Sequence, residues 1–317
     1  MFENMQLVAL KVLMLFILLA IGAVTRLTGL IKEEGARSIC SLIIYIVTPA
    51  NIISAFSTPF REDLLHGLLL SFLLAFIIFF LMSVISRLFI REKDPMKAPV
   101  LWFASAYPNA GYMGVPLQRA VLGDIGVFYC AAYIAVFHMF VWSYGVAILS
   151  HKRKTGASSR QDILRILKKC LLSPPLIAVV AGLVIFLFNI ELPEVVSSPL
   201  KELATMATPL PMLITGYYLA GGKLALILRN KWILVATALK MLVSPLLALG
   251  ACLVFAVSHD ASISCMIACA ASSASMTTML AAEYKRDSEL AACMVTLTTL
   301  LAIVTMPFFV ALVGSMT

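Results

Sequence analysis

Long apolar stretches alternate with short polar ones from one end of the chain to the other. A helix of about 20 apolar residues crosses the hydrocarbon core of a bilayer, so each apolar stretch predicts one membrane span. The predicted spans are residues 5–25, 37–57, 64–88, 98–120, 125–149, 165–188, 197–221, 231–257, 261–283 and 288–313. The pattern therefore predicts an all-α polytopic membrane protein with ten transmembrane helices.

Composition agrees with this class of protein. Hydrophobic residues make up 62% of the 317 residues and charged residues only 13%, against about 45–50% and about 25% in soluble domains. A net charge of +8 is by itself a feature of nucleic-acid-binding domains. Here the basic residues lie mostly in the short loops, where they set membrane topology, so no nucleic-acid partner is expected.

The basic residues are distributed unevenly among the loops. Of the 24 Lys and Arg residues, 19 lie in or beside the odd-numbered loops and 3 in or beside the even-numbered loops. Because loops rich in Lys and Arg stay in the cytoplasm, the odd-numbered loops are predicted to be cytoplasmic. We therefore expect a multi-pass protein of the cell (inner) membrane with both termini extracytoplasmic.

The longest polar stretch, residues 151–160, divides the predicted spans into two sets of five. We predict a first five-helix repeat over 1–150, a cytoplasmic linker over 151–164 and a second repeat over 165–317. Because five is odd, the second repeat enters the membrane inverted. Weak internal similarity supports the repeat, pairing Thr48-Pro49 with Thr208-Pro209, Met113 with Met276, and Asp124 with Asp287.

The fourth span contains a sequence that cannot continue as a regular helix, residues 107–117. Pro108 and Pro116 lack an N–H, and Gly111 and Gly114 add backbone freedom. Inside a bilayer, irregular backbone persists only where protein or a polar cavity satisfies it, and broken helices commonly form the binding sites of transporters. Further helix breaks are expected at Pro49, Pro209 and Pro211.

Asn109 follows Pro108 at the point where a new half-helix would begin. A helix N-terminus carries unpaired N–H groups and a partial positive charge, which favour an anion. The Asn109 amide adds a donor for a carboxylate. Asn109 therefore either binds substrate or only caps the half-helix. Tyr112, on the same broken segment, belongs to the predicted substrate site.

Polar residues in span nine and span eight are further candidates for substrate binding. Ser272, Ser273, Ser275 and Thr277 lie opposite the span-four break, although small hydroxyl residues also serve helix packing. Lys240 lies about 15 Å into its span. An ammonium at that depth is costly and indicates either function or pairing with backbone carbonyls.

His138 in span five and Asn51 in span two complete the predicted substrate site. A mid-span histidine either handles protons or substrate, or bonds a neighbouring helix as a neutral imidazole. Asn51 follows Pro49, so its helix is either distorted around the site or kinked for packing alone.

Residues for other chemistries are missing from the sequence. No Asp or Glu lies well inside a predicted span, which argues against a carboxylate proton relay and an aspartyl intramembrane protease. His138 has no motif-level serine partner, no glycine-rich phosphate loop occurs, and no Cys-x-x-Cys pair occurs. We predict that the protein is not an enzyme and uses no cofactor or metal ion.

The sequence Pro-Asn-x-x-x-Met-Gly-x-Pro-Leu at 108–117, followed by Gly123, resembles the fourth-helix motif of the auxin efflux carrier family, which includes plant PIN-type carriers and bacterial malonate or malate carriers. The resemblance extends over nearly the whole chain through Ala282-Glu283-Tyr284, Asp287 and Thr298–Pro307. It implies two inverted five-helix repeats, a crossover of broken helices four and nine, and an organic anion bound there by Asn109. The proline usual in the ninth-helix crossover is absent, so this break either forms without proline or is less unwound.

We predict a secondary carrier that moves a small organic anion, a mono- or dicarboxylate, by alternating access. The site is expected at the crossover of helices 4 and 9. A sodium-coupled organic-anion symporter is an alternative, and so is a non-transporting receptor or assembly protein on a transporter fold. The expected partners are the anion and the lipid bilayer, and the sequence leaves a homodimer open.

Overall fold

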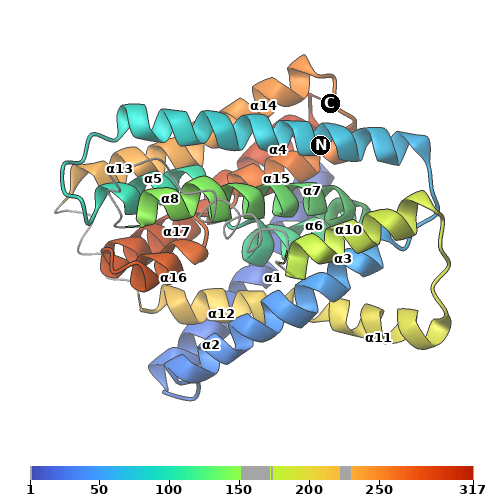
Figure 1. The fold of residues 1–317 in the computed structure, drawn as a ribbon, viewed down its shortest axis with the longest axis horizontal. Helices are drawn as coiled ribbons and strands as arrows, with labels where there is room; N and C mark the ends of the chain where they lie inside the picture. The colour runs from blue at the N-terminus through green and yellow to red at the C-terminus, as the bar shows by residue number, and fades with distance from the viewer. Residues whose placement is uncertain (1, 151–171, 173, 222–229, 317) are drawn as a thin grey trace.

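The computed structural model describes residues 2–150, 172, 174–221 and 230–316. Over these residues the chain is mainly helical, and no β-strand forms among them (Figure 1). The predicted linker, residues 151–164, lies outside the described residues. The prediction of an all-α fold is therefore confirmed for the part of the chain that the structure describes.

Helices and π-helical turns follow one another closely along the sequence. Those before residue 150 are α1 (Phe2–Leu27), α2 (Glu33–Leu42), η1 (Ile43–Val47), α3 (Thr48–Phe56), α4 (Glu62–Phe89), α5 (Ala98–Ala106), η2 (Ala110–Gly114), α6 (Val115–Leu122), α7 (Asp124–Phe140), η3 (Val141–Gly145) and α8 (Val146–Leu149). Those after it are α10 (Pro174–Leu187), α11 (Glu194–Thr205), α12 (Pro209–Leu219), α13 (Lys231–Ala238), η5 (Leu239–Val243), α14 (Ser244–Val254), α15 (His259–Ala270), α16 (Met276–Glu283) and α17 (Ser288–Gly314).

Among the described residues, five helical stretches are long and apolar enough to cross a membrane unaided: Glu33–Phe56, Glu62–Phe89, Asp124–Leu149, Lys231–Val254 and Ser288–Gly314. They coincide with predicted spans two, three, five, eight and ten. Predicted spans four, seven and nine each consist of two shorter helices separated by a break, so none forms one long helix. The chain is a multi-pass membrane protein, and the full count of ten spans stays a prediction.

Three helices widen just before a proline. The residue preceding Pro49, Pro116 and Pro245 donates its backbone N–H five residues back, which closes the π-helical turns η1, η2 and η5. Proline has no N–H, and its ring clashes with the carbonyl four residues earlier, so a wider turn relieves the clash. Gly111 and Gly114 lie within η2. Pro49 and Pro116 thus distort their helices without ending them.

Two other prolines stand beside a true interruption, between α11 and α12. The first of these helices ends at Thr205, and Pro209 begins the second. At the first position of a helix the missing N–H of proline costs nothing. Pro211 follows within the first turn of α12.

The helices form two packed groups. In the first helix group (α1, α2, η1, α3, α10, α11 and α12), α1 packs along α12, and α3 packs on α10 and α11. In the second helix group (α4–α8 with η2 and η3, and α13–α17 with η5), α7 packs on α4, α6 and α15, and α17 packs on α15 and α16. The groups meet where α3 and α10 contact α7, and where α1 and α12 contact α6 and α17.

Within the first helix group, α1 and α12 cross with closely approaching backbones. A Cβ added at Gly22 would lie 2.0 Å from the carbonyl oxygen of Leu213, and one added at Gly216 would lie 1.9 Å from that of Leu19. The two contacts are reciprocal, and Arg26, further along α1, meets Tyr217 further along α12, so the two helices run in the same direction where they cross. Small residues allow this close packing between helices in a membrane, so these two glycines hold the pair together.

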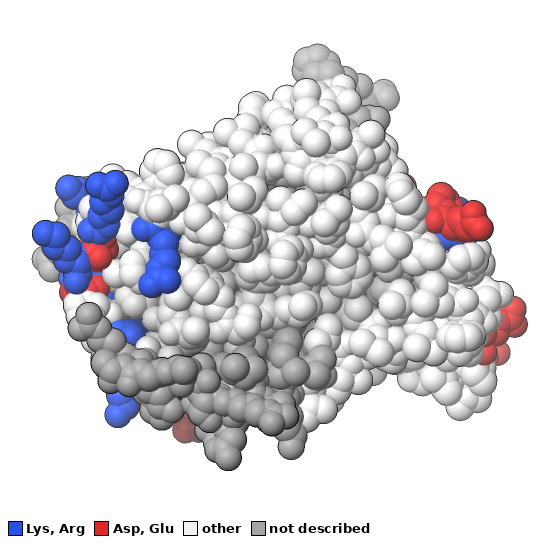
Figure 2. Space-filling view, turned by 45° about the horizontal axis from the view of Figure 1, so that its top comes forward, with Lys and Arg blue, Asp and Glu red and all other residues white. Residues whose placement is uncertain are grey.

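The surface suits a bilayer. In Figure 2, Lys and Arg side chains gather at one end of the molecule, Asp and Glu gather mainly at the opposite end, and a broad band between them carries almost no charge. One face of α4 exposes large apolar side chains at spacings of three and four residues: Leu69, Leu73, Phe76, Phe80 and Val84. A stripe of this kind is expected where a helix faces lipid.

Candidate functional site

The chain crosses itself where two helices are broken. Residues 107–109 separate α5 from η2, and residues 271–275 separate α15 from α16. The two extended segments pair antiparallel at Pro108 and Ser273. The Asn109 N–H donates to the Ser272 carbonyl at 2.7 Å, and the Ala274 N–H donates to the Tyr107 carbonyl at 2.9 Å. Each break therefore satisfies the backbone groups that the other leaves unpaired, as a membrane interior requires.

Side chains complete this crossover. The Ser273 hydroxyl donates to the Ala104 carbonyl near the end of α5 at 2.7 Å, and the Ser273 N–H donates to the Thr298 hydroxyl of α17 at 3.0 Å. The last carbonyls of a helix have no intrahelical donor, and Ser273 supplies one. The ninth-span break thus forms without a proline, through contacts with residues distant in the sequence.

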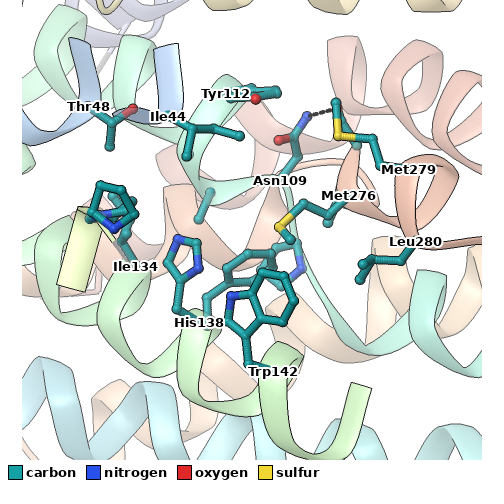
Figure 3. A pocket seen from close by; sticks show the side chains of 18 of the residues that line it. Ile44, Thr48, Asn109, Tyr112, Ile134, His138, Trp142, Met276, Met279 and Leu280 are labelled. Atoms are coloured by element: carbon teal, nitrogen blue, oxygen red, sulfur yellow. Dashed lines mark hydrogen bonds between the residues drawn. The ribbon is translucent and has the colours of Figure 1, made fainter. Parts of the chain in front are cut away.

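A cavity of about 670 Å³ opens beside the crossover (Figure 3). Both helix groups line it: Ile44 and Thr48 belong to the first, while Asn109, His138 and Ser275 belong to the second. Its walls are mostly apolar, and include Ile134, Phe137, Trp142, Met276, Met279 and Leu280. Largely preformed apolar clefts with a few polar groups are typical of small-molecule sites.

The polar groups of the cavity gather at the start of the two half-helices. Asn109 precedes η2 and Ser275 precedes α16. The Asn109 amide nitrogen donates to the Ser275 hydroxyl at 3.0 Å, and both side chains are more than 90% buried. Two helix N-termini, each with a partial positive charge, therefore meet at one edge of the cavity.

Two further polar atoms of the cavity wall have no hydrogen-bond partner among the described residues. They are the Tyr112 hydroxyl and Nδ1 of His138, and both are buried. Buried polar groups are nearly always paired in folded proteins, so these atoms are available to a ligand. Glu283, which is exposed, is the one charged residue of the described chain that lines the cavity.

Comparison with known proteins agrees with this architecture. A family model described as membrane transport protein matches residues 7–310. The chain belongs to the membrane transport protein family. This match confirms the resemblance to auxin efflux carriers drawn from the fourth-span motif.

Two similar chains in this family come from archaea. An uncharacterized transporter of Methanothermobacter thermautotrophicus is 26% identical over 302 residues, which cover 94% of this chain and 96% of the relative. An uncharacterized transporter of Methanocaldococcus jannaschii is 24% identical over 302 residues, covering 91% and 93% respectively. Both alignments are nearly full-length, so the likeness concerns the whole transporter.

The cavity of this membrane transport protein brings together only some of the residues predicted from the sequence. Asn109, Tyr112, His138 and Ser275 line it. Ser272 and Ser273 are fully buried in the crossover itself and do not line the cavity. Their contacts are those of residues that hold the two broken helices together.

Lys240 also lies off the cavity wall. Its side chain is fully buried, and its ammonium donates to the Cys269 carbonyl at 2.7 Å. Cys269 is the penultimate residue of α15, where unpaired carbonyls concentrate partial negative charge. Lys240 therefore neutralises the broken end of α15, and the Ser244 hydroxyl approaches the same carbonyl at 3.5 Å.

Asn51 and Thr277 are the remaining predicted ligands, and neither lines the cavity. Both side chains are fully buried. Neither amide atom of Asn51 has a hydrogen-bond partner among the described residues, and the same holds for the Thr277 hydroxyl. Asn51 lies on α3 in the first helix group, whereas Thr277 lies on α16 in the second.

The apolar wall of the cavity is not predicted by the sequence. Ile44, Trp142, Met276 and Leu280 line the cavity, but in a chain that is 62% hydrophobic an apolar residue does not reveal whether it faces lipid, core or ligand. Trp142 lies in the π-helical turn η3. Such turns are frequent at functional sites, but η3 contains no proline to predict it.

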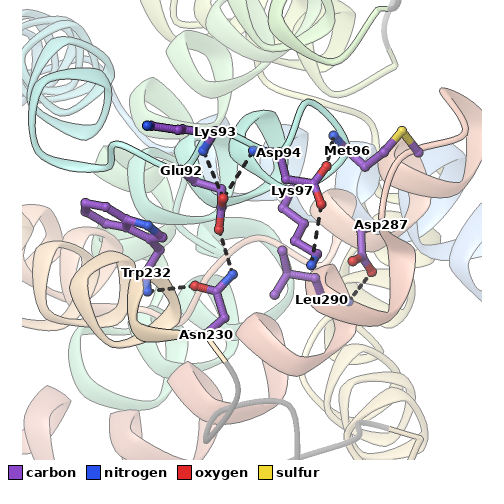
Figure 4. A network of polar contacts seen from close by, with 9 residues as sticks. All are labelled: Glu92, Lys93, Asp94, Met96, Lys97, Asn230, Trp232, Asp287 and Leu290. Carbon is purple, nitrogen blue, oxygen red and sulfur yellow. Dashed lines mark hydrogen bonds and ion pairs between the residues drawn. The ribbon is translucent and has the colours of Figure 1, made fainter.

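A polar network ties several segments together at the end of the molecule where α16 terminates (Figure 4). In addition to the contacts drawn there, Arg286 donates to the carbonyls of Pro95, Leu149 and Ser150. Glu92 accepts hydrogen bonds from the N–H groups of Lys93 and Asp94 and from the Asn230 amide, which also caps α13. Burial raises the pKa of Glu92, but the bonds from Asp94, Asn230 and Lys93 outweigh it and the pKa is lowered.

Proposed function

We propose that this protein is a secondary carrier that moves a small organic anion by alternating access, with the anion bound beside the crossover. The observation that carries the proposal is the meeting of two half-helix N-termini at the cavity, with Asn109 bonded to Ser275 between them. A helix N-terminus favours an anion through its unpaired N–H groups and dipole. The Asn109 amide and the unpartnered Tyr112 and His138 atoms supply further polar contacts.

The cavity favours a carboxylate with one charge and an apolar body. Its polar groups lie mainly at the half-helix ends, while Phe137, Trp142, Met276 and Leu280 line much of the rest. A second ionised group placed against that wall would lose its hydration without a partner, which is costly. Glu283 at the cavity would in addition repel a second negative charge. We therefore expect monocarboxylates to bind more tightly than dicarboxylates.

We further propose ten spans arranged as two inverted five-helix repeats, residues 1–150 and 165–317, in the cell membrane with both termini outside the cytoplasm. The reciprocal pairing of the two broken helices supports a pseudo-twofold relation between the repeats. Single cysteines placed in residues 151–160 should react only with reagents that reach the cytoplasm. A C-terminus labelled from the cytoplasmic side would contradict the ten-span arrangement.

Transport into proteoliposomes tests the activity directly. Radiolabelled indole-3-acetate serves as the probe with an apolar body, and malonate as the compact dicarboxylate. Uptake of indole-3-acetate above that of protein-free vesicles is expected, and uptake of malonate should be weaker. Replacing sodium by choline tests the sodium-coupled alternative. Absence of uptake for a wide panel of carboxylates would favour a receptor over a carrier.

Asn109→Ala should weaken binding by about 1–3 kcal/mol, the cost of leaving a charged ligand without a partner in a desolvated site. This corresponds to about 5- to 150-fold in affinity. Asn230→Ala is the control, because it also removes an amide but lies away from the cavity. Equal affinity of native protein and a folded Asn109→Ala variant would remove Asn109 from the site.

A further inference from the structure

Asn51 of α3 has a buried side-chain amide to which the described part of the chain offers no hydrogen bond. It is fully buried, and neither its amide nitrogen nor its amide oxygen has a hydrogen-bond partner among the described residues. Burying an unpaired amide is costly, and such a group in a folded protein calls for an explanation. Leucine has the same branching and the same number of side-chain heavy atoms without a polar group, so shape alone does not account for an asparagine here.

Its position relates it to the cavity. Thr48, three residues earlier on the same helix, lines the cavity, and residues three apart on a helix share a face. Further along α3, Phe56 packs against Phe128 of α7 with ring centroids 4.6 Å apart. Asn51 therefore lies between the cavity and the point where α3 and α7 close against each other.

The two walls of the cavity belong to different helix groups. Thr48, on one wall, belongs to the first group, as does Asn51 on the same helix, whereas the polar edge formed by Asn109 and Ser275 belongs to the second. Alternating access requires the cavity to close on one side and open on the other. If the second helix group shifts along α3 by about one helical turn, about 5.4 Å, the polar edge formed by Asn109 and Ser275 moves from the level of Thr48 to that of Asn51.

We propose that Asn51 is a substrate ligand of the oppositely open state. In that state its amide donates to the carboxylate from the first helix group, while the half-helix N-termini continue to hold the anion from the second. The amide of Asn51 then lacks a partner in the present conformation because its partner, the carboxylate, reaches it only in the oppositely open state. The inference rests on the proposed function, since it requires a carried anion and two access states.

Sided accessibility tests the first requirement without any substrate. Asn51→Cys in membrane vesicles should react with a membrane-impermeant maleimide from the extracytoplasmic side, since the predicted topology places the α3 C-terminus there. The native chain is the control, because the cysteines that the structure describes are all buried. A residue 51 that stays unreactive from that side overturns the proposal, whether or not a transported anion has been found.

Sided affinity tests the ligand role. Asn51→Leu should lower the affinity for indole-3-acetate offered on the extracytoplasmic side by about tenfold and leave the affinity on the cytoplasmic side unchanged, whereas Asn109→Ala should lower both. The unfolding temperature of Asn51→Leu should equal or exceed that of the native protein, because an unpaired amide has been removed. Ser71→Ala controls for loss of a buried polar group outside the cavity, since its hydroxyl bonds Gly67 of its own helix.

Each outcome has one meaning. A loss of affinity on one side in a fully stable variant supports the proposal. Unchanged affinity on both sides, equal loss on both sides, or a lowered unfolding temperature assigns Asn51 to structure and overturns it. If the native protein carries neither indole-3-acetate nor malonate, the proposed function fails for these anions, and the maleimide reaction alone decides whether Asn51 becomes exposed.

Discussion

Replacing Lys240 by methionine distinguishes the effect of the buried ammonium on folding stability from its effect on transport. The Lys240 side chain is fully buried and donates to the Cys269 carbonyl at 2.7 Å, and among the described residues no carboxylate forms a salt bridge with it. Methionine retains most of the length and flexibility of the lysine side chain but removes its charge. The substitution therefore changes electrostatics more than packing.

The expected change in stability follows from two opposing contributions. Loss of the ammonium leaves the Cys269 carbonyl with only the Ser244 hydroxyl at 3.5 Å, a long hydrogen bond, which costs about 1–3 kcal/mol. The ammonium no longer has to be desolvated, which returns several kcal/mol. The second contribution is at least as large as the first. We expect an unfolding temperature equal to or a few degrees above that of the native protein.

Transport should respond in the opposite direction. The ammonium neutralises the end of α15 that precedes the crossover, beside which the proposed anion site lies, and intramembrane charges of this kind usually serve function. We expect Lys240→Met to lower the initial uptake rate at least tenfold, equivalent to about 1.4 kcal/mol in the barrier, and Lys240→Arg to retain part of the activity. Lys231→Met is the matched control, because Lys231 is exposed at the start of α13.

The assay is uptake per amount of folded protein, with thermal unfolding recorded on the same preparations. Native uptake by a stable Lys240→Met variant would show that the ammonium serves packing alone. A drop in unfolding temperature of many degrees would refute the energetic reasoning, because the bond to Cys269 would then outweigh the desolvation of the charge.

Two further predictions concern stability. Gly216→Val should lower the unfolding temperature, because its Cβ would lie 1.9 Å from the Leu19 carbonyl oxygen and overpacking costs about 1–3 kcal/mol. Gly250→Val is the control and should have a smaller effect, because a Cβ at Gly250 meets nothing within 4 Å. Glu92 has a lowered pKa, so its stabilising contribution is present above the usual value of 4.5 and is lost as pH falls through the lowered one. Glu92→Gln should therefore lose less stability on acidification than the native protein, and identical acid unfolding curves would count against this.

The break in the fourth span could be predicted from the sequence because its causes are local. Proline and glycine between 108 and 116 are incompatible with a regular helix whatever surrounds them. The break at residues 271–275 has a different origin. It depends on hydrogen bonds to Tyr107, Asn109 and Thr298. These residues are distant in the sequence, so residues 271–275 alone do not predict the break.

The same distinction applies to individual side chains. Counting residues from the end of a span was enough to place Lys240 deep in the membrane, because helical rise is regular. Its partner, the Cys269 carbonyl, comes from another helix and became known only from the structure. The serines of span nine show a related limit. Ser275 faces the cavity while Ser272 and Ser273 do not. Because these serines lie in irregular backbone, no helical or strand periodicity predicts which of their side chains point toward the cavity.

The reciprocal pairing at the crossover has a consequence for the biogenesis of the protein. Residues 107–109 enter the membrane early in synthesis, whereas their partners at 272–274 follow only near the end. Until then the Asn109 N–H and the Tyr107 carbonyl lack the bonds that hydrocarbon demands. A chain truncated after the first five predicted spans should therefore be recognised as unfinished by membrane quality control and degraded, and coexpression of the missing half should rescue it.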